Sequence, residues 1–164
     1  MPAGSTYEPI ATTTLSSSST DVQFDTISSA YTDLVLVVAG KDTTSTYSPY
    51  IQFNGDTTTN YSQTYMYGDG TTPTSGRDLN TSTVYLGSLG ATQGNIIIHI
   101  MNYANTTTSK MALIRINAAN FRTYANVVLW SKTPEAINRI NIKMESSGNF
   151  ATGTTFTLYG IAAA

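Results

Sequence analysis

Short stretches in which apolar and polar residues alternate recur along the whole chain, and most of them end at a turn signal. Residues 137–145 alternate most cleanly, with Ile140, Ile142 and Met144 on one face. Residues 21–26 show the same pattern. Alternation with a period of two is typical of a β-strand that buries one face. No stretch keeps the apolar spacing of an α-helix for more than about two turns. The sequence therefore predicts an all-β fold.

Other segments extend this pattern. Residues 31–39 are apolar on both faces, as is typical of a central strand covered on both sides. Residues 68–80 have no strand pattern and predict a projecting loop, and residues 133–136 predict a short helix or a turn. About ten strands favour a single antiparallel sandwich or barrel. The remaining strands are predicted at residues 49–54, 61–67, 81–86, 95–103, 110–117, 125–132 and 154–161.

The composition disfavours several kinds of function. The net charge is −2, whereas nucleic-acid binding calls for a basic surface. The chain has no cysteine, which excludes disulfides and thiolate metal sites. Its first residues lack the basic and apolar regions of a signal peptide, and no apolar run has the length of a membrane-spanning helix. Charged residues make up only 11% of the chain, which we interpret as a surface partly intended for protein contacts.

The sequence contains few candidate catalytic residues. His99 is the single histidine, and a Ser-His-Asp site would have to use it, yet the chain has no Gly-x-Ser-x-Gly elbow. We therefore expect a sheet histidine with a local hydrogen bond. Asp56 and Asp69 lie in glycine-flanked turns, where turn formation explains an aspartate better than calcium binding does. We predict that the protein is not an enzyme and has no catalytic residues, metal or cofactor.

Tyrosines are concentrated between residues 47 and 67, and three of them share one face of the strand at residues 61–67. Tyrosine suits interfaces because it buries a large area and keeps a hydroxyl group for hydrogen bonding. Three interpretations remain open: a lining of the core or its rim, a subunit interface, or a surface that stacks on glycans. Together with two charged residues of the 68–80 segment, the candidate contact residues are Tyr47, Tyr50, Tyr61, Tyr65, Tyr67, Asp69 and Arg77.

Three segments carry a resemblance to a known family. They are residues 1–15 (MPAGSTYEPIATTTL), residues 53–70 with their FNGD, NYS and YGDG motifs, and residues 156–161 (FTLYGI). In these segments the chain resembles small virion structural proteins of tailed bacteriophages, particularly those that infect cyanobacterial and marine hosts. The resemblance spans essentially the whole chain. Its motifs are turn and strand signatures, and no active-site residues come with it.

The resemblance implies a β-sandwich of jelly-roll type on the phage particle, after synthesis in the host cytoplasm. A capsid cement or decoration protein is the leading expectation. Such a protein binds the major capsid protein from outside, often as a homotrimer, and residues 1–8 would form an extended arm onto a neighbour. The alternative is a tail-fibre or baseplate adhesin that binds host glycans through the tyrosines of residues 47–67 or the segment 68–80.

Overall fold

The computed structural model describes residues 6–44, 47–118 and 122–162, and in these residues the chain forms twelve strands in two antiparallel sheets. The all-β prediction is confirmed. The larger sheet has the order β1 (Tyr7–Thr14), β12 (Thr155–Ile161), β3 (Asp33–Gly40), β8 (Gly94–Met101), β9 (Lys110–Ala118), β10 (Arg122–Trp130), β5 (Tyr61–Gly68) and β6 (Thr74–Thr81). The smaller sheet has the order β2 (Asp21–Phe24), β11 (Ile140–Met144), β4 (Pro49–Phe53) and β7 (Val84–Tyr85).

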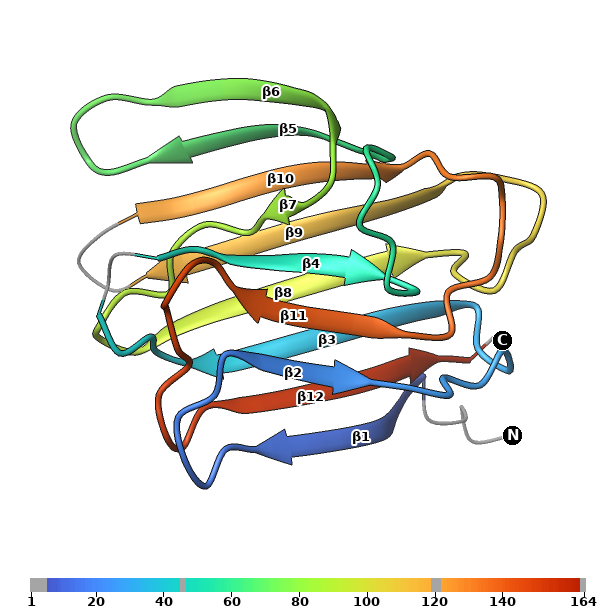
Figure 1. The fold of residues 1–164 in the computed structure, drawn as a ribbon, viewed down its shortest axis with the longest axis horizontal. Coiled ribbons are helices and arrows are strands. Elements are labelled where there is room, and N and C mark those ends of the chain that lie inside the picture. Colours follow the sequence, from blue (N-terminus) through green and yellow to red (C-terminus); the bar gives the residue numbers. More distant parts are fainter. Residues whose placement is uncertain (1–5, 45–46, 119–121, 163–164) are drawn as a thin grey trace.

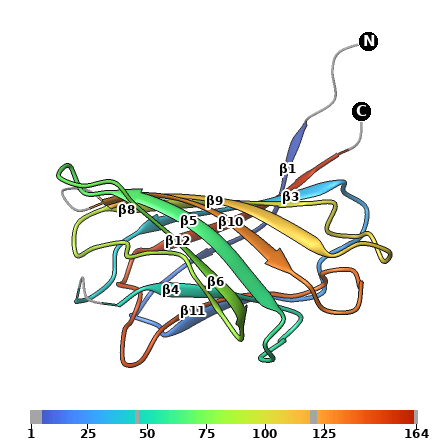
Figure 2. The ribbon, with the colours of Figure 1, turned by 90° about the horizontal axis from the view of Figure 1, so that it is seen from above.

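The two sheets pack face to face as a sandwich around one hydrophobic core (Figures 1 and 2). Inward side chains of β3 and β8, among them Leu36 and Ile98, are fully buried. Phe53 of the small sheet packs on Trp130 of the large sheet, with ring centroids 5.6 Å apart. Removal of these apolar side chains from water is the main force that holds the sheets together.

Two strands of the large sheet, β1 and β6, were not predicted from the sequence, and both lie at its edges. Strand β6 occupies residues 74–80 of the predicted loop, so the prediction was wrong there, whereas residues 69–73 form no strand and connect β5 to β6. Its sequence TSGRDLNT has a single large apolar residue, because an edge strand at this place needs backbone pairing with β5 more than a buried face. Residues 133–136 form a bend followed by irregular backbone, and no helix.

Strand β1 is the second edge strand that the sequence patterns did not indicate. It begins at Tyr7, which pairs with Ile161 of β12, and a bulge follows between Pro9 and Ala11. The tip of the β1–β12 pair rises away from the small sheet (Figure 2). The predicted arm of residues 1–8 therefore ends in a paired strand, and its residues 1–5 lie outside the described residues.

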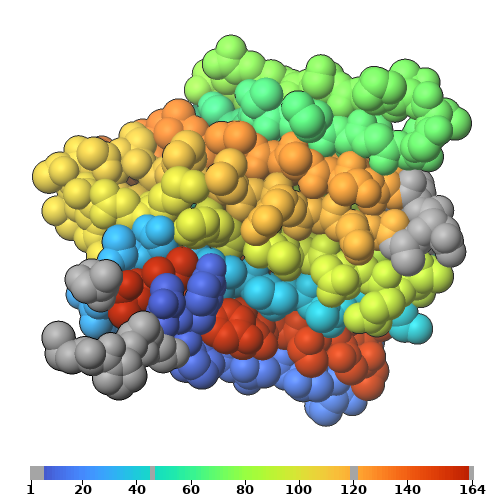
Figure 3. Space-filling view, turned by 180° about the vertical axis from the view of Figure 1, so that it is seen from behind, coloured from blue at the N-terminus to red at the C-terminus, as the bar shows by residue number. Residues whose placement is uncertain are grey.

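The large sheet is covered on one face only. The prediction for residues 31–39 was a strand covered on both sides, but the small sheet covers only the face with Leu34, Leu36 and Val38. The other face is seen directly in Figure 3, where neighbouring strands lie side by side with no second layer over them. The apolar residues on one face of this strand therefore form the core, and those on the other face belong to the uncovered outer surface of the large sheet.

Candidate functional site

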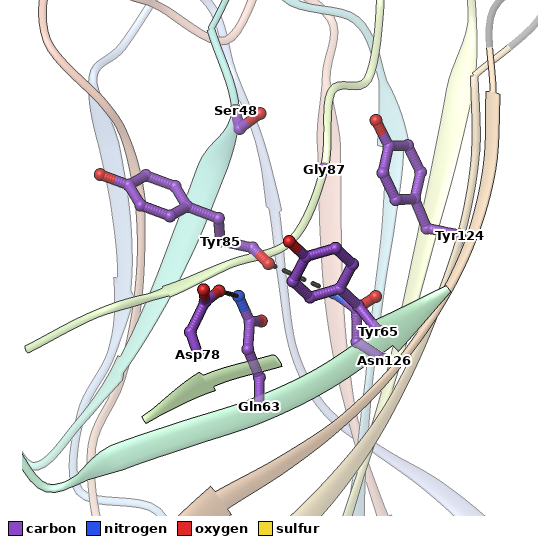
Figure 4. A pocket seen from close by; sticks show the side chains of 8 residues that line it. All are labelled: Ser48, Gln63, Tyr65, Asp78, Tyr85, Gly87, Tyr124 and Asn126. Carbon is purple, nitrogen blue, oxygen red and sulfur yellow. Dashed lines mark hydrogen bonds between the residues drawn. The ribbon is translucent and has the colours of Figure 1, made fainter. Parts of the chain in front are cut away.

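Strand β5 leaves the core as it runs, and its inward face becomes the wall of a cleft. Tyr61 is fully buried, whereas Tyr65 and Tyr67, further along on the same face, are half-buried. The large sheet extends past the small sheet at this edge, so that β5 and β6 overhang the short strand β7 (Figure 1). The resulting tyrosine cleft has a volume of about 190 Å³ and is lined by Ser48, Gln63, Tyr65, Asp78, Tyr85, Gly87, Tyr124 and Asn126 (Figure 4).

Two glycines hold the tyrosine rings of the cleft in place. Tyr65 lies across Gly76, its partner on β6, so closely that a Cβ on this glycine would come within 2.4 Å of the Tyr65 hydroxyl. Gly87 has a φ of +94°, which favours glycine, and a Cβ there would lie 3.0 Å from the ring of Tyr124. The orientation of both rings is therefore set by the backbone that they cover.

A polar wall lies beside these rings. Gln63 donates a hydrogen bond of 2.7 Å from Nε2 to Oδ2 of Asp78, and Asn126 donates one of 3.2 Å from Nδ2 to the backbone oxygen of Tyr85 (Figure 4). Gln63 and Asn126 are 5% and 4% exposed. Gln63 Oε1 and Asn126 Oδ1 have no hydrogen-bond partner among the described residues. Both oxygens are buried, and buried acceptors normally find donors.

An aromatic row continues from the cleft to the end of the hairpin. Tyr65 stacks on Tyr67 with centroids 6.5 Å apart, and Tyr67 contacts Tyr124 at 5.1 Å. The guanidinium group of Arg122 lies 4.8 Å above the Tyr67 ring and donates a hydrogen bond of 3.4 Å to the Tyr124 hydroxyl. That hydrogen bond, ahead of the charge effects of the neighbouring groups, raises the pKa of Arg122. The row is therefore cationic at its outer end.

The candidate tyrosines divide between several places. Tyr65 and Tyr67 share the inward face of β5, as the sequence indicated. Tyr61 is a core residue, so it is not available as a surface contact: its hydroxyl accepts a 3.0 Å hydrogen bond from the backbone N–H of Phe53. Burial raises the pKa of this hydroxyl beyond the usual range. Tyr50 and Tyr47 lie outside the cleft lining.

Tyr50 packs edge-on against Tyr85 at 6.2 Å, where β4 pairs with β7. The Tyr47 hydroxyl accepts a 3.1 Å hydrogen bond from Ser147, in the turn that precedes the C-terminal strand. These two tyrosines therefore stabilise local contacts near the cleft without facing into it.

Asp69 and Arg77 also lie away from the cleft. Asp69 Oδ1 accepts hydrogen bonds from the hydroxyl and N–H of Thr71 and from the N–H of Thr72, which lower its pKa to about 2. This turn role agrees with the expectation for Asp69. Arg77 pairs with Thr64 and lies on the outer face of the sheet, opposite the cleft.

The uncovered face of the large sheet carries a second candidate surface. Five large apolar side chains are exposed there to between 39% and 62%, and we call them the outer patch: Met66, Met111, Leu113, Val127 and Leu129. Leu113 pairs directly with Val127, and Met111 with Leu129, so the patch is continuous across β9 and β10. A groove of about 570 Å³ runs between Met66 and Leu113, over the small side chain of Ala125. Contiguous exposed apolar area of this kind marks interaction sites.

His99 lies beside the outer patch and pairs with Asp33. Its Nε2 is 3.0 Å from Asp33 Oδ2, and Asp33 Oδ1 accepts a hydrogen bond from the backbone N–H of Asn102. The expectation of a sheet histidine with a local hydrogen bond is confirmed. Across the described ranges, no group of three acidic or histidine side chains lies close enough to hold a metal ion. Nor does any helix in those ranges have the length and hydropathy to cross a membrane.

Several residues of these surfaces were not found from the sequence. Gln63, Asp78 and Asn126 come from three strands and meet only because β5 pairs with β6 on one side and with β10 on the other. No local pattern contains that register. The outer patch had a signal, since residues 110–117 and 125–132 are apolar on both faces.

The fold is thus a two-sheet β-sandwich whose large sheet has one apolar, uncovered face and, on its opposite face, an aromatic cleft beside β7. Comparisons of the chain with known protein families, with curated proteins and with solved structures found no match.

Proposed function

We propose that the protein is a non-enzymatic structural protein of a phage virion, a cement or decoration subunit that binds the major capsid protein on the capsid exterior. The observation that carries the proposal is the outer patch together with its groove. The resemblance to small virion structural proteins supports it, and the jelly-roll connectivity that the resemblance implies is part of the same proposal.

The uncovered face has the size that a stable contact needs. Eight strands spaced by about 4.8 Å and about eight residues long present roughly 1,000 Å² on one face. A standard interface buries about 800 Å² on each partner. Docking on the face with Leu113 and Val127 at its centre would place a standard interface on the large sheet.

The charges around the patch favour a different protein over a second copy of the same face. Arg77 and Arg115 lie on the outer face beside the patch, and neither forms an ion pair with any residue that the structure describes. Two copies meeting face to face would enclose the guanidinium groups of both copies in one interface, and like charges are unfavourable in an interface. A partner with an apolar centre and carboxylates around it fits, and the proposal assigns that role to the capsid protein.

The opposite outer face, on the small sheet, carries amide side chains at its centre, of which Asn141 and Gln52 are each 6% exposed. On the small sheet, Asn141 lies directly between Gln23 and Gln52, and its Nδ2 donates a 2.8 Å hydrogen bond to Gln23 Oε1. The β1–β12 tip with exposed Tyr7 rises on the same side as the outer patch, so it reaches toward the proposed partner (Figure 2). Self-association as a homotrimer, through edge strands that need covering, remains a further part of the proposal.

The test uses capsids assembled without the protein and replenished with purified variants. Leu113→Glu places a carboxylate at the centre of the patch, where we expect at least a tenfold loss of capsid occupancy, measured as copies per capsid by gel densitometry. Thr57→Glu adds the same charge in an exposed turn and serves as the control. Circular dichroism verifies that both variants fold. Equal occupancy by Leu113→Glu and wild type would refute docking through this face.

The tail position is the second candidate, and the tyrosine cleft favours it, because an adhesin needs a ligand site. The copy number in purified particles separates the two. A decoration protein is present in many copies per virion, and a tail-fibre or baseplate protein in only a few.

A further inference from the structure

We infer that the tyrosine cleft is a binding site for a single neutral sugar ring, such as a terminal residue of a glycan. This inference goes beyond the capsid role and does not depend on it, because the cleft and the outer patch lie on opposite faces of β5; it names the ligand class for the site that the tail position would need. Gln63 and Tyr65 face the cleft, whereas Thr64 and Met66 face outward.

The size of the cleft limits its ligand. Pockets for drug-sized molecules measure about 300–1,000 Å³, and the tyrosine cleft, at about 190 Å³, is smaller. A single six-membered ring matches this volume better than an extended chain or a fused cofactor. Further sugar units would lie outside the cleft, along the row formed by Tyr67 and Tyr124.

The cleft combines an aromatic surface with acceptors, and a sugar ring has the complementary groups. Its C–H faces pack on an aromatic ring, and its hydroxyl groups donate hydrogen bonds. Tyr65, fixed over Gly76, supplies the ring. Asp78 supplies a carboxylate that receives one hydrogen bond, from Gln63. The two nine-tenths-buried amides, Gln63 and Asn126, each leave a side-chain oxygen without a donor among the described residues.

The charge of the cleft disfavours anionic ligands. Its lining includes one carboxylate, Asp78, and no basic side chain. An unpaired carboxylate beside a phosphate or a uronic acid would be repulsive. A small cation is the competing ligand, since a carboxylate and tyrosine faces also attract ammonium groups, and titration with tetramethylammonium tests for it.

The experiment titrates the ¹⁵N-labelled full chain with neutral methyl glycosides of glucose, galactose, mannose and N-acetylglucosamine. A ligand of roughly a dozen heavy atoms at ordinary efficiency binds with a Kd of about 1 mM, so the titration extends well above that concentration. We expect at least one glycoside to shift the side-chain amide signals of Gln63 and Asn126 and the backbone signal of Gly87. No shift with any of the four would overturn the inference.

Variants assign the binding to the cleft. Tyr65→Ala removes the ring, and Asp78→Asn removes the carboxylate; each is expected to weaken binding at least tenfold. Gly76→Ala keeps every polar group but forces the Tyr65 ring to move, so a similar loss is expected. Tyr7→Ala removes a tyrosine that is 54% exposed at the far edge of the sheet and should bind like wild type.

Two results would count against the inference. Unchanged affinity in Tyr65→Ala and Asp78→Asn would place the sugar elsewhere on the molecule. Tight binding of tetramethylammonium, with no glycoside bound, would identify the cleft as a cation site. Neither result bears on capsid docking, which is measured with the Leu113 variant.

Discussion

Asp56 offers the sharpest quantitative prediction, because its carboxylate ties the turn before β5 to the core. Asp56 is only 6% exposed. Its Oδ1 accepts hydrogen bonds from the N–H of Thr58 at 2.9 Å and from the Thr58 hydroxyl. Its Oδ2 accepts from Asn60 Nδ2 at 2.9 Å and from Trp130 Nε1 at 2.8 Å. Every one of these bonds favours the ionised form.

The pKa of Asp56 gives the magnitude. Burial by itself raises this pKa, but the hydrogen bonds from Thr58, Asn60 and Trp130 outweigh it and lower the value from 3.8 to about 2. Each pKa unit corresponds to about 1.4 kcal/mol, so the carboxylate contributes about 2 kcal/mol to the free energy of unfolding. Because the folded-state pKa is the lower one, this contribution is fully present above the unfolded pKa. It is lost as the pH falls through about 2.

The perturbation is Asp56→Asn, which removes the titration and turns an amide N–H₂ toward one of the surrounding donors. The assay is urea denaturation at a series of pH values, followed by the fluorescence of Trp130, the single tryptophan of the chain and 2% exposed. We expect the variant to be destabilised at neutral pH. We expect the gap to wild type to shrink by about 2 kcal/mol as the pH approaches about 2.

Other carboxylates do not affect the stability difference between wild type and Asp56→Asn. Asp69 also has a pKa lowered to about 2, by the hydrogen bonds from Thr71, but it titrates in both proteins and cancels from the difference. Asp69→Asn is the matched control: an aspartate in a similar turn, but exposed, whose replacement should cost less at neutral pH. A gap between wild type and Asp56→Asn that stays constant from neutral pH to about 2 would refute the argument.

Three further predictions concern the core. Tyr61→Phe leaves the buried N–H of Phe53 without its 3.0 Å partner and should lower the free energy of unfolding by about 1–3 kcal/mol in urea denaturation; an unchanged midpoint would contradict this. Gly160→Ala places a Cβ 2.3 Å from the ring of Tyr31 and should cost about 1–3 kcal/mol, visible as a lower melting temperature in calorimetry, whereas an equal Tm would mean that the ring moves freely. Lys110 is 2% exposed, and burial lowers its pKa, which means that the charged form is unfavourable in this place. Lys110→Met replaces the charge with an apolar side chain of similar size, so the variant should unfold at no lower urea concentration than wild type; a clearly lower concentration would show that the ammonium group stabilises the fold.

The strands could be predicted from the sequence where one buried face alternates with a polar one. Strand β11, with Ile140, Ile142 and Met144 facing the core, is such a case. Strand β6 could not be predicted in this way. An edge strand is stabilised by backbone pairing, so its sequence can contain Thr, Ser, Gly and Arg without an alternating apolar face. At a sheet edge, a loop-like composition therefore does not exclude a paired strand.

The candidate site was predictable only in part, and the reason is register. The alternation of residues 61–67 places Tyr61, Tyr65 and Tyr67 on one face, and they do share it. Where along that face the core ends depends on how far the small sheet extends, which no pattern within β5 contains. Tyr61 therefore became a core residue and Tyr65 a cleft residue, although the local sequence treats them alike.

The alternation of β5 also explains how one hairpin can carry two independent surfaces. Successive side chains point to opposite faces of the sheet, so Met66 belongs to the outer patch while its neighbours Tyr65 and Tyr67 belong to the cleft side. A partner docked on the outer patch would leave the cleft open at the edge beside β7. A subunit bound to a capsid through Leu113 and Val127 could thus still present a sugar site to its surroundings. Loss of capsid docking with intact sugar binding in Leu113→Glu, and the reverse in Tyr65→Ala, is the pattern that this arrangement requires.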